Sequence, residues 1–178
     1  MMNIFLIGFM GSGKSTLAGK LAEQFSLQLF DLDRIIEEKM NMKIREIFEE
    51  FGEAAFRDIE KKAFQHIAEN EDNYVMATGG GTPCDPEVMR KINECGLSVY
   101  LKMLPEELTK RLKKENKERP LVKGKKENDL RQFIIAELKQ RSFFYFQAQW
   151  VIHPVEIHEH YLFQQIETYK NQTSSKDA

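Results

Sequence analysis

Cysteines, long apolar runs and a surplus of positive charge are all scarce or missing in this sequence. The two cysteines, Cys84 and Cys95, are too few for a disulfide framework and are not spaced like a metal-binding pair. No apolar segment approaches the roughly 20 residues that a membrane-spanning helix needs. The formal net charge of -2 argues against the basic field with which many proteins attract nucleic acids. We therefore expect a cytoplasmic protein that binds neither membranes nor nucleic acids.

What the sequence does contain fits one compact domain. Its 178 residues are 42% hydrophobic and 30% charged, which is an ordinary composition for a chain with a sizeable core. Residues 1–8 lack the basic start of a signal peptide, and their short apolar run leads into a glycine-rich loop. The chain has no internal repeat or long linker, so we expect a single domain over residues 1–170 and a disordered tail over 171–178.

Short apolar segments alternate with amphipathic ones along the chain. The apolar segments predict buried strands at 3–7, 27–30, 74–78, 97–101 and 150–152. The amphipathic segments predict helices at 14–24, 35–40, 44–51, 53–69, 86–95, 105–114, 130–146 and 157–169. Residues 118–129 are polar and contain Pro120 and Gly124, which predicts a mobile loop. Strands that alternate with helices favour an α/β fold of three layers, in which helices cover both faces of a parallel sheet.

The segment GFMGSGKS, residues 8–15, matches the phosphate-binding pattern G-x-x-x-x-G-K-[ST] between a predicted strand and a predicted helix. Glycines let successive backbone N–H groups face a polyphosphate, and the start of the helix adds its positive dipole end. Lys14 is placed to reach the outer phosphates, and the Ser15 hydroxyl to bind Mg2+. The predicted ATP contacts here are Gly11, Ser12, Gly13, Lys14, Ser15 and Thr16. The alternative is a glycine-rich turn without a ligand, and the motif alone does not separate kinases from other nucleotide-binding proteins.

Two aspartates follow the second predicted strand, in FDLDRIIEE. Asp31 and Asp33 are two residues apart, so on an extended chain both side chains would point to the same side. Ligands gather at the carboxyl ends of parallel strands, which places both carboxylates beside the phosphate loop. The third strand is followed by glycines rather than by aspartate, so Asp31 is the candidate to hold Mg2+. Asp33 is the candidate to accept a proton from an attacking hydroxyl, with helix capping as the alternative role for the pair.

These motifs occur in a particular order. GFMGSGKST, the Asp-x-Asp pair, GEAAFRDIE, TGGG and RPL follow one another as they do in shikimate kinases, and the sequence resembles that family over about residues 3–148. The resemblance implies a phosphate-loop fold like that of nucleoside monophosphate kinases, with five parallel strands in the order 2-3-1-4-5. It also implies the reaction, in which ATP phosphorylates the 3-hydroxyl of shikimate on the route to chorismate and the aromatic amino acids. The implied cofactor is Mg2+, the implied ligands are ATP and shikimate, and we expect a monomer.

The resemblance further assigns a site for shikimate, partly on the helical segment of about 33–62. A glycine run lets the backbone approach a hydroxyl-bearing ring closely; it comprises Gly79, Gly80 and Gly81. Arg57 and Arg141 match the family's arginines for the shikimate carboxylate, which a planar guanidinium can bind through two hydrogen bonds. The surroundings of Arg141 depart from the family, which often has proline two residues later, where this chain has Phe143.

More local roles are possible for the same residues. The glycines could form a tight turn before Pro83. Arg57 and Arg141 could be surface arginines that pair with carboxylates on their own helices, for example Arg57 with Glu53 or Glu60.

The remaining implied residues belong to the ATP side. Arg119, in ERPLVKGKK, matches the arginine of a lid loop at about 116–129, where it could neutralise charge on the transferred phosphoryl group. The alternative is a solvated lysine-rich loop. Arg111 matches a family arginine that stacks near adenine, and Pro154 is a candidate for the same pocket. The expected catalytic residues are thus Lys14, Asp33 and Arg119.

Other functions remain open from sequence. A gluconate or nucleoside monophosphate kinase would share the architecture, although TGGG and the arginine of FRDIE argue against both. A nucleotide-dependent switch would carry a base-selecting motif such as N-K-x-D, which the sequence lacks, and would leave the second arginine without a task.

Overall fold

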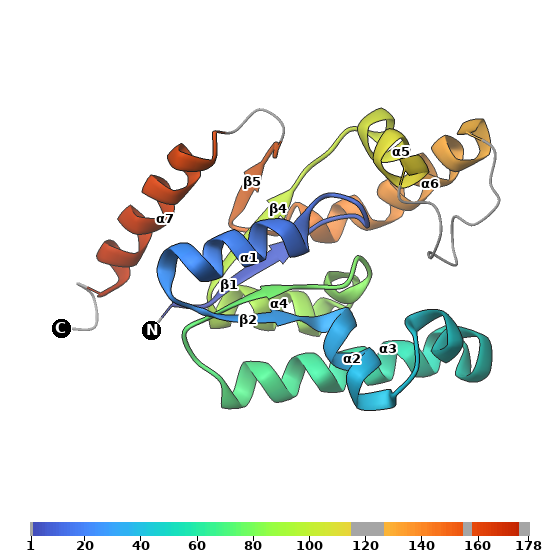
Figure 1. Ribbon diagram of the computed structural model, residues 1–178, viewed down its shortest axis with the longest axis horizontal. Helices are drawn as coiled ribbons and strands as arrows, with labels where there is room; N and C mark the ends of the chain where they lie inside the picture. Colours follow the sequence, from blue (N-terminus) through green and yellow to red (C-terminus); the bar gives the residue numbers. More distant parts are fainter. Residues whose placement is uncertain (1, 115–126, 155–157, 175–178) are drawn as a thin grey trace.

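The computed structural model describes residues 2–114, 127–154 and 158–174. Its centre is a five-stranded sheet made of β1 (Ile4–Ile7), β2 (Gln28–Asp31), β3 (Tyr74–Ala77), β4 (Leu97–Leu101) and β5 (Trp150–Ile152). The strand order is β2-β3-β1-β4-β5 and every neighbouring pair is parallel (Figure 1). This is the order that the resemblance implied, and the prediction of a parallel sheet between helical layers is confirmed.

Helices connect these strands on both faces of the sheet. In the described residues they are α1 (Lys14–Phe25), α2 (Leu32–Met40), α3 (Ile44–Asn70), α4 (Pro86–Cys95), α5 (Pro105–Lys114), α6 (Glu127–Tyr145) and α7 (Glu159–Ser174), with a short 3-10 turn, η1 (Thr82–Cys84). Gly52 interrupts α3 with a φ of 80° and ψ of 172°, at the position where the sequence predicted one helix to end and the next to begin.

The sheet separates two hydrophobic cores because its central strands are buried on both faces and are apolar, apart from Ser98 of β4. Side chains alternate between the two faces of a strand, so Phe5 and Ile7 of β1 enter one core and Ile4 and Leu6 enter the other. Helices α3 and α4 cover the first face, and α1 and α7 cover the second (Figure 1). Burial on both faces explains why these strands read as continuous apolar runs rather than as alternating ones.

A third cluster packs beside the phosphate loop. Phe9, from the loop itself, is buried with Leu108 and Leu112 of α5 and with Leu130 and Ile134 of α6. The loop is thereby attached to the α5–α6 pair as well as to the sheet.

The three largest differences from the sequence-based prediction are at the starts of α2 and α6 and at the end of α7. Helix α2 begins at Leu32, because the Asp31 side chain accepts a hydrogen bond from the Arg34 backbone and caps the helix early. Helix α6 begins at Glu127, so residues 127–129 are helical and do not belong to the expected loop. Helix α7 continues to Ser174, so the prediction of a disordered tail from residue 171 was wrong for residues 171–174. Once the buried side chains of Leu162 and Ile166 fix the helix, each further turn costs little free energy.

No helix among the described residues is both long and apolar enough to cross a bilayer.

Candidate active site

The phosphate loop joins β1 to α1 in a conformation that glycine makes accessible. Gly11 and Gly13 have φ values of 79° and 94°, which side-chain-bearing residues rarely adopt. Gly13 is also the N-cap of α1 and provides no side-chain cap, so the first N–H groups of this helix stay available for an anion. Ser12 is buried, and within the described residues its hydroxyl has no hydrogen-bond partner. A phosphate oxygen would satisfy that hydroxyl.

Lys14 lies along the inside of the loop. Its Nζ donates hydrogen bonds of 2.8 Å to the Gly8 carbonyl and 3.1 Å to the Phe9 carbonyl. These bonds hold the ammonium group over the loop, which is where a triphosphate would need a positive charge.

Ser15 and Asp31 meet at the carboxyl end of β2, where the sequence predicted a magnesium site. The Ser15 Oγ donates to Asp31 Oδ2 at 2.5 Å. A hydroxyl and a carboxylate are the hard oxygen ligands that Mg2+ prefers. The described residues contain no group of three His, Cys, Asp or Glu side chains that could hold a metal unaided. The pair therefore fits an ion that takes its other ligands from phosphates and water.

Asp33 was predicted to lie on an extended chain, and this prediction was wrong. Because α2 starts at Leu32, Asp33 lies in the first turn of that helix, where a carboxylate suits the positive end of the helix dipole. Asp31 and Asp33 nevertheless line the same cavity. The capping role considered for the pair belongs to Asp31.

A cavity of about 260 Å³ lies on the α1–α7 side of the phosphate loop. Its lining includes the predicted ATP residues Ser12, Gly13, Thr16, Arg111 and Pro154. Arg111 also donates to the Gly11 carbonyl at 3.4 Å, and an ion pair between Lys20 and Glu159 joins α1 to α7 at the edge of this cavity.

A larger cavity of about 1020 Å³, here called the acceptor cavity, lies on the other side of the loop. Ser15 and Asp31 belong to its wall, so it opens onto the predicted magnesium site. The wall also contains most of the residues predicted to bind shikimate, which are Asp33, Arg57, Gly80, Gly81 and Arg141.

Gly79 and Gly81, in the run after β3, are required because charged side chains lie where their Cβ atoms would be. A Cβ on Gly79 would lie 2.3 Å from Glu60 Oε1 and 3.0 Å from Asp33 Oδ1. A Cβ on Gly80 would lie 3.4 Å from Arg141 Nη1, and one on Gly81 only 2.4 Å from Arg57 Nη1. None of the three glycines has a positive φ. The run therefore supplies space rather than an unusual turn.

Arg57 does make the intrahelical pairs that the sequence offered as its alternative role. Its Nη1 donates to Glu60 Oε2 at 2.7 Å and its Nη2 to Glu53 Oε1 at 3.2 Å. Burial lowers the pKa of Arg57, but the carboxylates of Glu60 and Glu53 outweigh burial and raise it above its ordinary value. The same guanidinium lines the acceptor cavity, so pairing and facing the cavity are compatible.

Arg141 reaches the glycine run from α6. It pairs with Glu137 one turn earlier, and its guanidinium carbon lies 5.4 Å from the centre of the Phe9 ring. Burial lowers the pKa of Arg141, while Tyr145 and Glu137 more than compensate, so the pKa is raised. The Tyr145 hydroxyl donates to the Gly80 carbonyl, which ties the end of α6 to the run.

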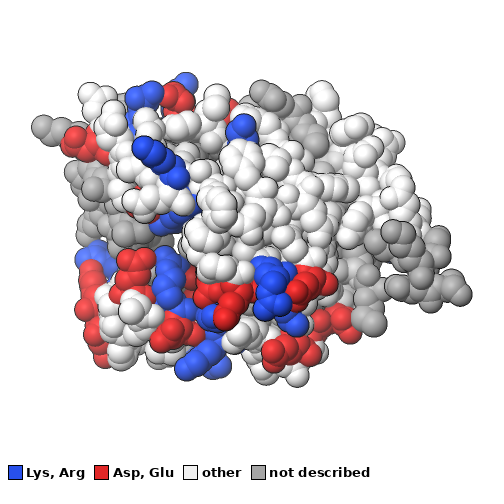
Figure 2. Space-filling model, turned by 180° about the vertical axis from the view of Figure 1, so that it is seen from behind, with Lys and Arg blue, Asp and Glu red and all other residues white. Residues whose placement is uncertain are grey.

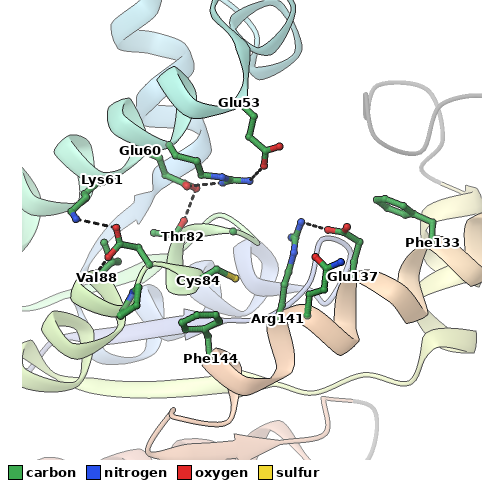
Figure 3. A pocket seen from close by; sticks show the side chains of 15 residues that line it. Glu53, Glu60, Lys61, Thr82, Cys84, Val88, Phe133, Glu137, Arg141 and Phe144 are labelled. Carbon is green, nitrogen blue, oxygen red and sulfur yellow. Dashed lines mark hydrogen bonds and ion pairs between the residues drawn. The ribbon is translucent and has the colours of Figure 1, made fainter.

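Glu60 is a site residue that sequence reasoning missed, since it was considered only as a surface partner of Arg57. Its side chain is 3% exposed, and it accepts from Arg57 and, at 2.6 Å, from Thr82 Oγ1 (Figure 3). Glutamate is almost never buried unless it is paired. The available signal was the i, i+3 spacing to Arg57, but burial cannot be seen from that spacing.

One predicted catalytic residue cannot be placed. Arg119 and most of the expected lid loop lie outside the described residues.

The fold and the two cavities on either side of the phosphate loop define a phosphate-loop kinase, which brings a nucleotide and a small acceptor together over one edge of a parallel sheet. A family model described as shikimate kinase matches residues 10–169. The chain belongs to the shikimate kinase family.

Individual relatives agree with this assignment. A shikimate kinase from Bacteroides thetaiotaomicron is 40% identical over 159 residues, which cover 89% of this chain and 90% of the relative. The crystal structure of shikimate kinase from that organism matches with a TM-score of 0.85 at 35% identity, covering 97% of this chain and 98% of the other. Shikimate kinase from Acinetobacter baumannii, solved in complex with shikimate, matches with a TM-score of 0.81 at 29% identity, covering 99% and 94%.

Proposed function

We propose that this chain transfers the γ-phosphoryl group of ATP to the 3-hydroxyl of shikimate, giving shikimate 3-phosphate and ADP. The observation that carries the proposal is the convergence of Arg57 and Arg141 on one glycine run, in a cavity that also contains Asp33 and opens onto the phosphate loop. Two guanidinium groups beside an accessible backbone suit a small ring that carries one carboxylate and several hydroxyls.

In this proposal the nucleotide is held by the phosphate loop. Lys14, the N–H groups at the start of α1 and the Ser12 hydroxyl bind the phosphates, while Thr16, Arg111 and Pro154 lie along the cavity for the adenosine part. Ser15 and Asp31 would hold Mg2+, which when bound offsets the negative charge of the triphosphate.

The acceptor is oriented from the opposite side. Arg57 and Arg141 bind its carboxylate, and Gly79, Gly80 and Gly81 allow the ring to approach the backbone. Asp33 orients the attacking hydroxyl and accepts its proton. Positioning and charge stabilisation supply most of the rate, because phosphoryl transfer needs little covalent help from the protein.

We propose that the chain acts as a monomer. We propose a cytoplasmic location, which agrees with the scarcity of cysteine. The role of Arg119 stays a sequence-based prediction.

The test is ADP release from MgATP with shikimate, gluconate, AMP or CMP as the added acceptor. We expect stimulation by shikimate alone. Stimulation by gluconate or by a nucleotide would replace the proposed acceptor, and the absence of stimulation by any of the four would favour a slowly hydrolysing nucleotide switch.

A further inference from the structure

Arg57 and Arg141, which face the glycine run, each also form an ion pair with a glutamate that is not part of the acceptor cavity wall. Arg57 pairs with Glu53, and Arg141 pairs with Glu137 (Figure 3). Glu53 and Glu137 line a second cavity of about 650 Å³ together with both arginines, whereas neither glutamate belongs to the wall of the acceptor cavity. The arginines therefore form a partition between the two cavities, and we call the two glutamates the outer glutamates.

The outer glutamates make the charge of the partition negative in the absence of an acceptor. Two guanidinium groups stand against three carboxylates, those of Glu53, Glu60 and Glu137. An incoming carboxylate would add a fourth negative charge to a partly buried group of ions, which is unfavourable unless another carboxylate withdraws.

The three glutamates differ in how easily they can withdraw. Glu60 is 3% exposed and is fixed by its bonds to Arg57 and Thr82. The side chains of Glu53 and Glu137 are 69% and 21% exposed, and each has a single ion pair among the described residues. An exposed carboxylate that leaves an arginine is solvated by water, while a buried one is not.

We propose that Glu53 and Glu137 hold the acceptor arginines in the empty site and are displaced by the carboxylate of the acceptor. This inference rests on the proposed function. It makes the outer glutamates competitors of the substrate: they keep Arg141 and Arg57 neutralised and lower the affinity for a carboxylate-bearing acceptor. Glu137 has the larger effect because its pair is less exposed, with Arg141 itself 13% exposed.

The experiment compares Glu137→Gln with wild type in steady-state assays. Glutamine keeps the size of the side chain and removes its charge. We expect the KM for shikimate to fall roughly twofold to fivefold, the range open to a partly exposed ion pair, with the KM for ATP unchanged. Glu53→Gln should lower the KM for shikimate by a smaller factor. An unchanged or higher KM for shikimate in Glu137→Gln would overturn the inference, since it would mean that Glu137 supports Arg141 instead of competing for it.

Two controls isolate the charge exchange. Glu94→Gln removes the glutamate of another i, i+4 pair, with Arg90 on α4, and should leave the KM for shikimate unchanged. The carboxamide of shikimate, used as a competitive inhibitor, should bind wild type and Glu137→Gln equally, because it has no negative charge to exchange. Equal tightening of the carboxamide, or a fall in KM of the same size in Glu94→Gln, would contradict the proposal.

The wild-type assay separates the two hypotheses. If wild type does not turn over shikimate, the proposed function fails. If wild type is active and the KM for shikimate does not fall in Glu137→Gln, only the inference about the outer glutamates fails.

Discussion

Glu60 shows how a single residue can connect several parts of this site. It fixes Arg57 from its own helix and Thr82 from the turn that follows the glycine run, and its Oε1 lies where a side chain on Gly79 would have to be. A buried carboxylate with two partners is expensive to disturb, because removing either partner leaves an uncompensated charge or acceptor. Glu60 therefore fixes the position of Arg57 at the wall of the acceptor cavity.

At the scale of single residues, Lys14→Met tests whether the loop of residues 8–15 binds the phosphates of ATP. Methionine keeps the length of the side chain but loses the charge and the donors that now reach the Gly8 and Phe9 carbonyls. We expect turnover to fall by about 10³-fold or more, with an unchanged circular dichroism spectrum. Lys39→Met, an exposed change on α2, is the control. Turnover close to wild type in Lys14→Met would refute the assignment.

Arg57→Ala tests the acceptor site. Loss of a charged, bidentate contact should raise the KM for shikimate about 10- to 100-fold while changing the KM for ATP much less. The matched control is Arg90→Ala, which removes an exposed arginine from an i, i+4 pair. If the two Michaelis constants of Arg57→Ala rise equally, Arg57 has no specific role toward the acceptor.

At the scale of elements, the turn between β3 and α4 is the meeting point of the site. Arg57 approaches it from α3 and Arg141 from α6, and Tyr145 fastens α6 to it through the Gly80 carbonyl. The absence of side chains on Gly79 and Gly81 is what allows Glu60 and Arg57 of α3 to come this close. The interruption of α3 at Gly52 lies five residues before Arg57, so the second half of α3 can take its own direction toward the run.

Gly81→Ala tests this packing. The new Cβ would lie 2.4 Å from Arg57 Nη1, so the guanidinium must move. We expect a rise of about tenfold in the KM for shikimate and a smaller change in the KM for ATP, measured by the same assay.

Gly19→Ala is the matched control, because it adds a methyl group inside α1 where nothing lies within 4 Å. It should raise the free energy of unfolding by about 0.5 to 1 kcal/mol through helix propensity, without changing either KM. Normal shikimate kinetics in Gly81→Ala would show that Arg57 can move without consequence.

At the scale of the whole molecule, the two proposed ligand cavities lie on either side of the phosphate loop, at the carboxyl ends of the strands. Figure 2 shows the molecule from behind, with acidic and basic side chains interspersed over the lower part and large uncharged areas above them. Neither sign of charge forms a continuous field on this face, as expected for a protein whose net charge is -2.

The two cavities predict how ligands stabilise the protein. MgATP at about 100 times its dissociation constant should add about 2.7 kcal/mol to the free energy of unfolding, which corresponds to a rise of roughly 5 to 10 °C in Tm. Shikimate should produce a further rise when added with MgADP, which has no γ-phosphoryl group to transfer, because it occupies a separate cavity. Thermal unfolding measured by calorimetry with each ligand, and with both, checks this.

Excess EDTA should abolish turnover and weaken the stabilisation by ATP, if Ser15 and Asp31 hold the metal. Full turnover in EDTA would contradict the magnesium assignment.

The sequence predicted α4 and α5 to the residue because their signals are local. Pro86 and Pro105 mark the starts of these helices, and Gly96 follows the end of α4. It misplaced the start of α2 because a capping aspartate and a strand-ending aspartate look the same in sequence, and only the contact between Asp31 and the Arg34 backbone decides between them. The error for Asp33 has the same cause, because the direction of its side chain depends on whether the residue belongs to the strand or to the helix.

By itself the sequence determined the phosphate loop, because all of its binding groups lie within eight consecutive residues. The backbone N–H groups, the lysine and the hydroxyl take up their positions when a strand precedes the loop and a helix follows it. It also determined the layered fold, because strands buried on both faces must be apolar throughout. The tertiary structure alone decided how the residues of the proposed acceptor site come together. Arg57, the glycine run and Arg141 are far apart along the chain, and they meet only because a parallel sheet brings the carboxyl ends of its strands and the helices beyond them to one edge. Which of their carboxylate partners are buried and which can leave depends on that packing, and no local spacing encodes it.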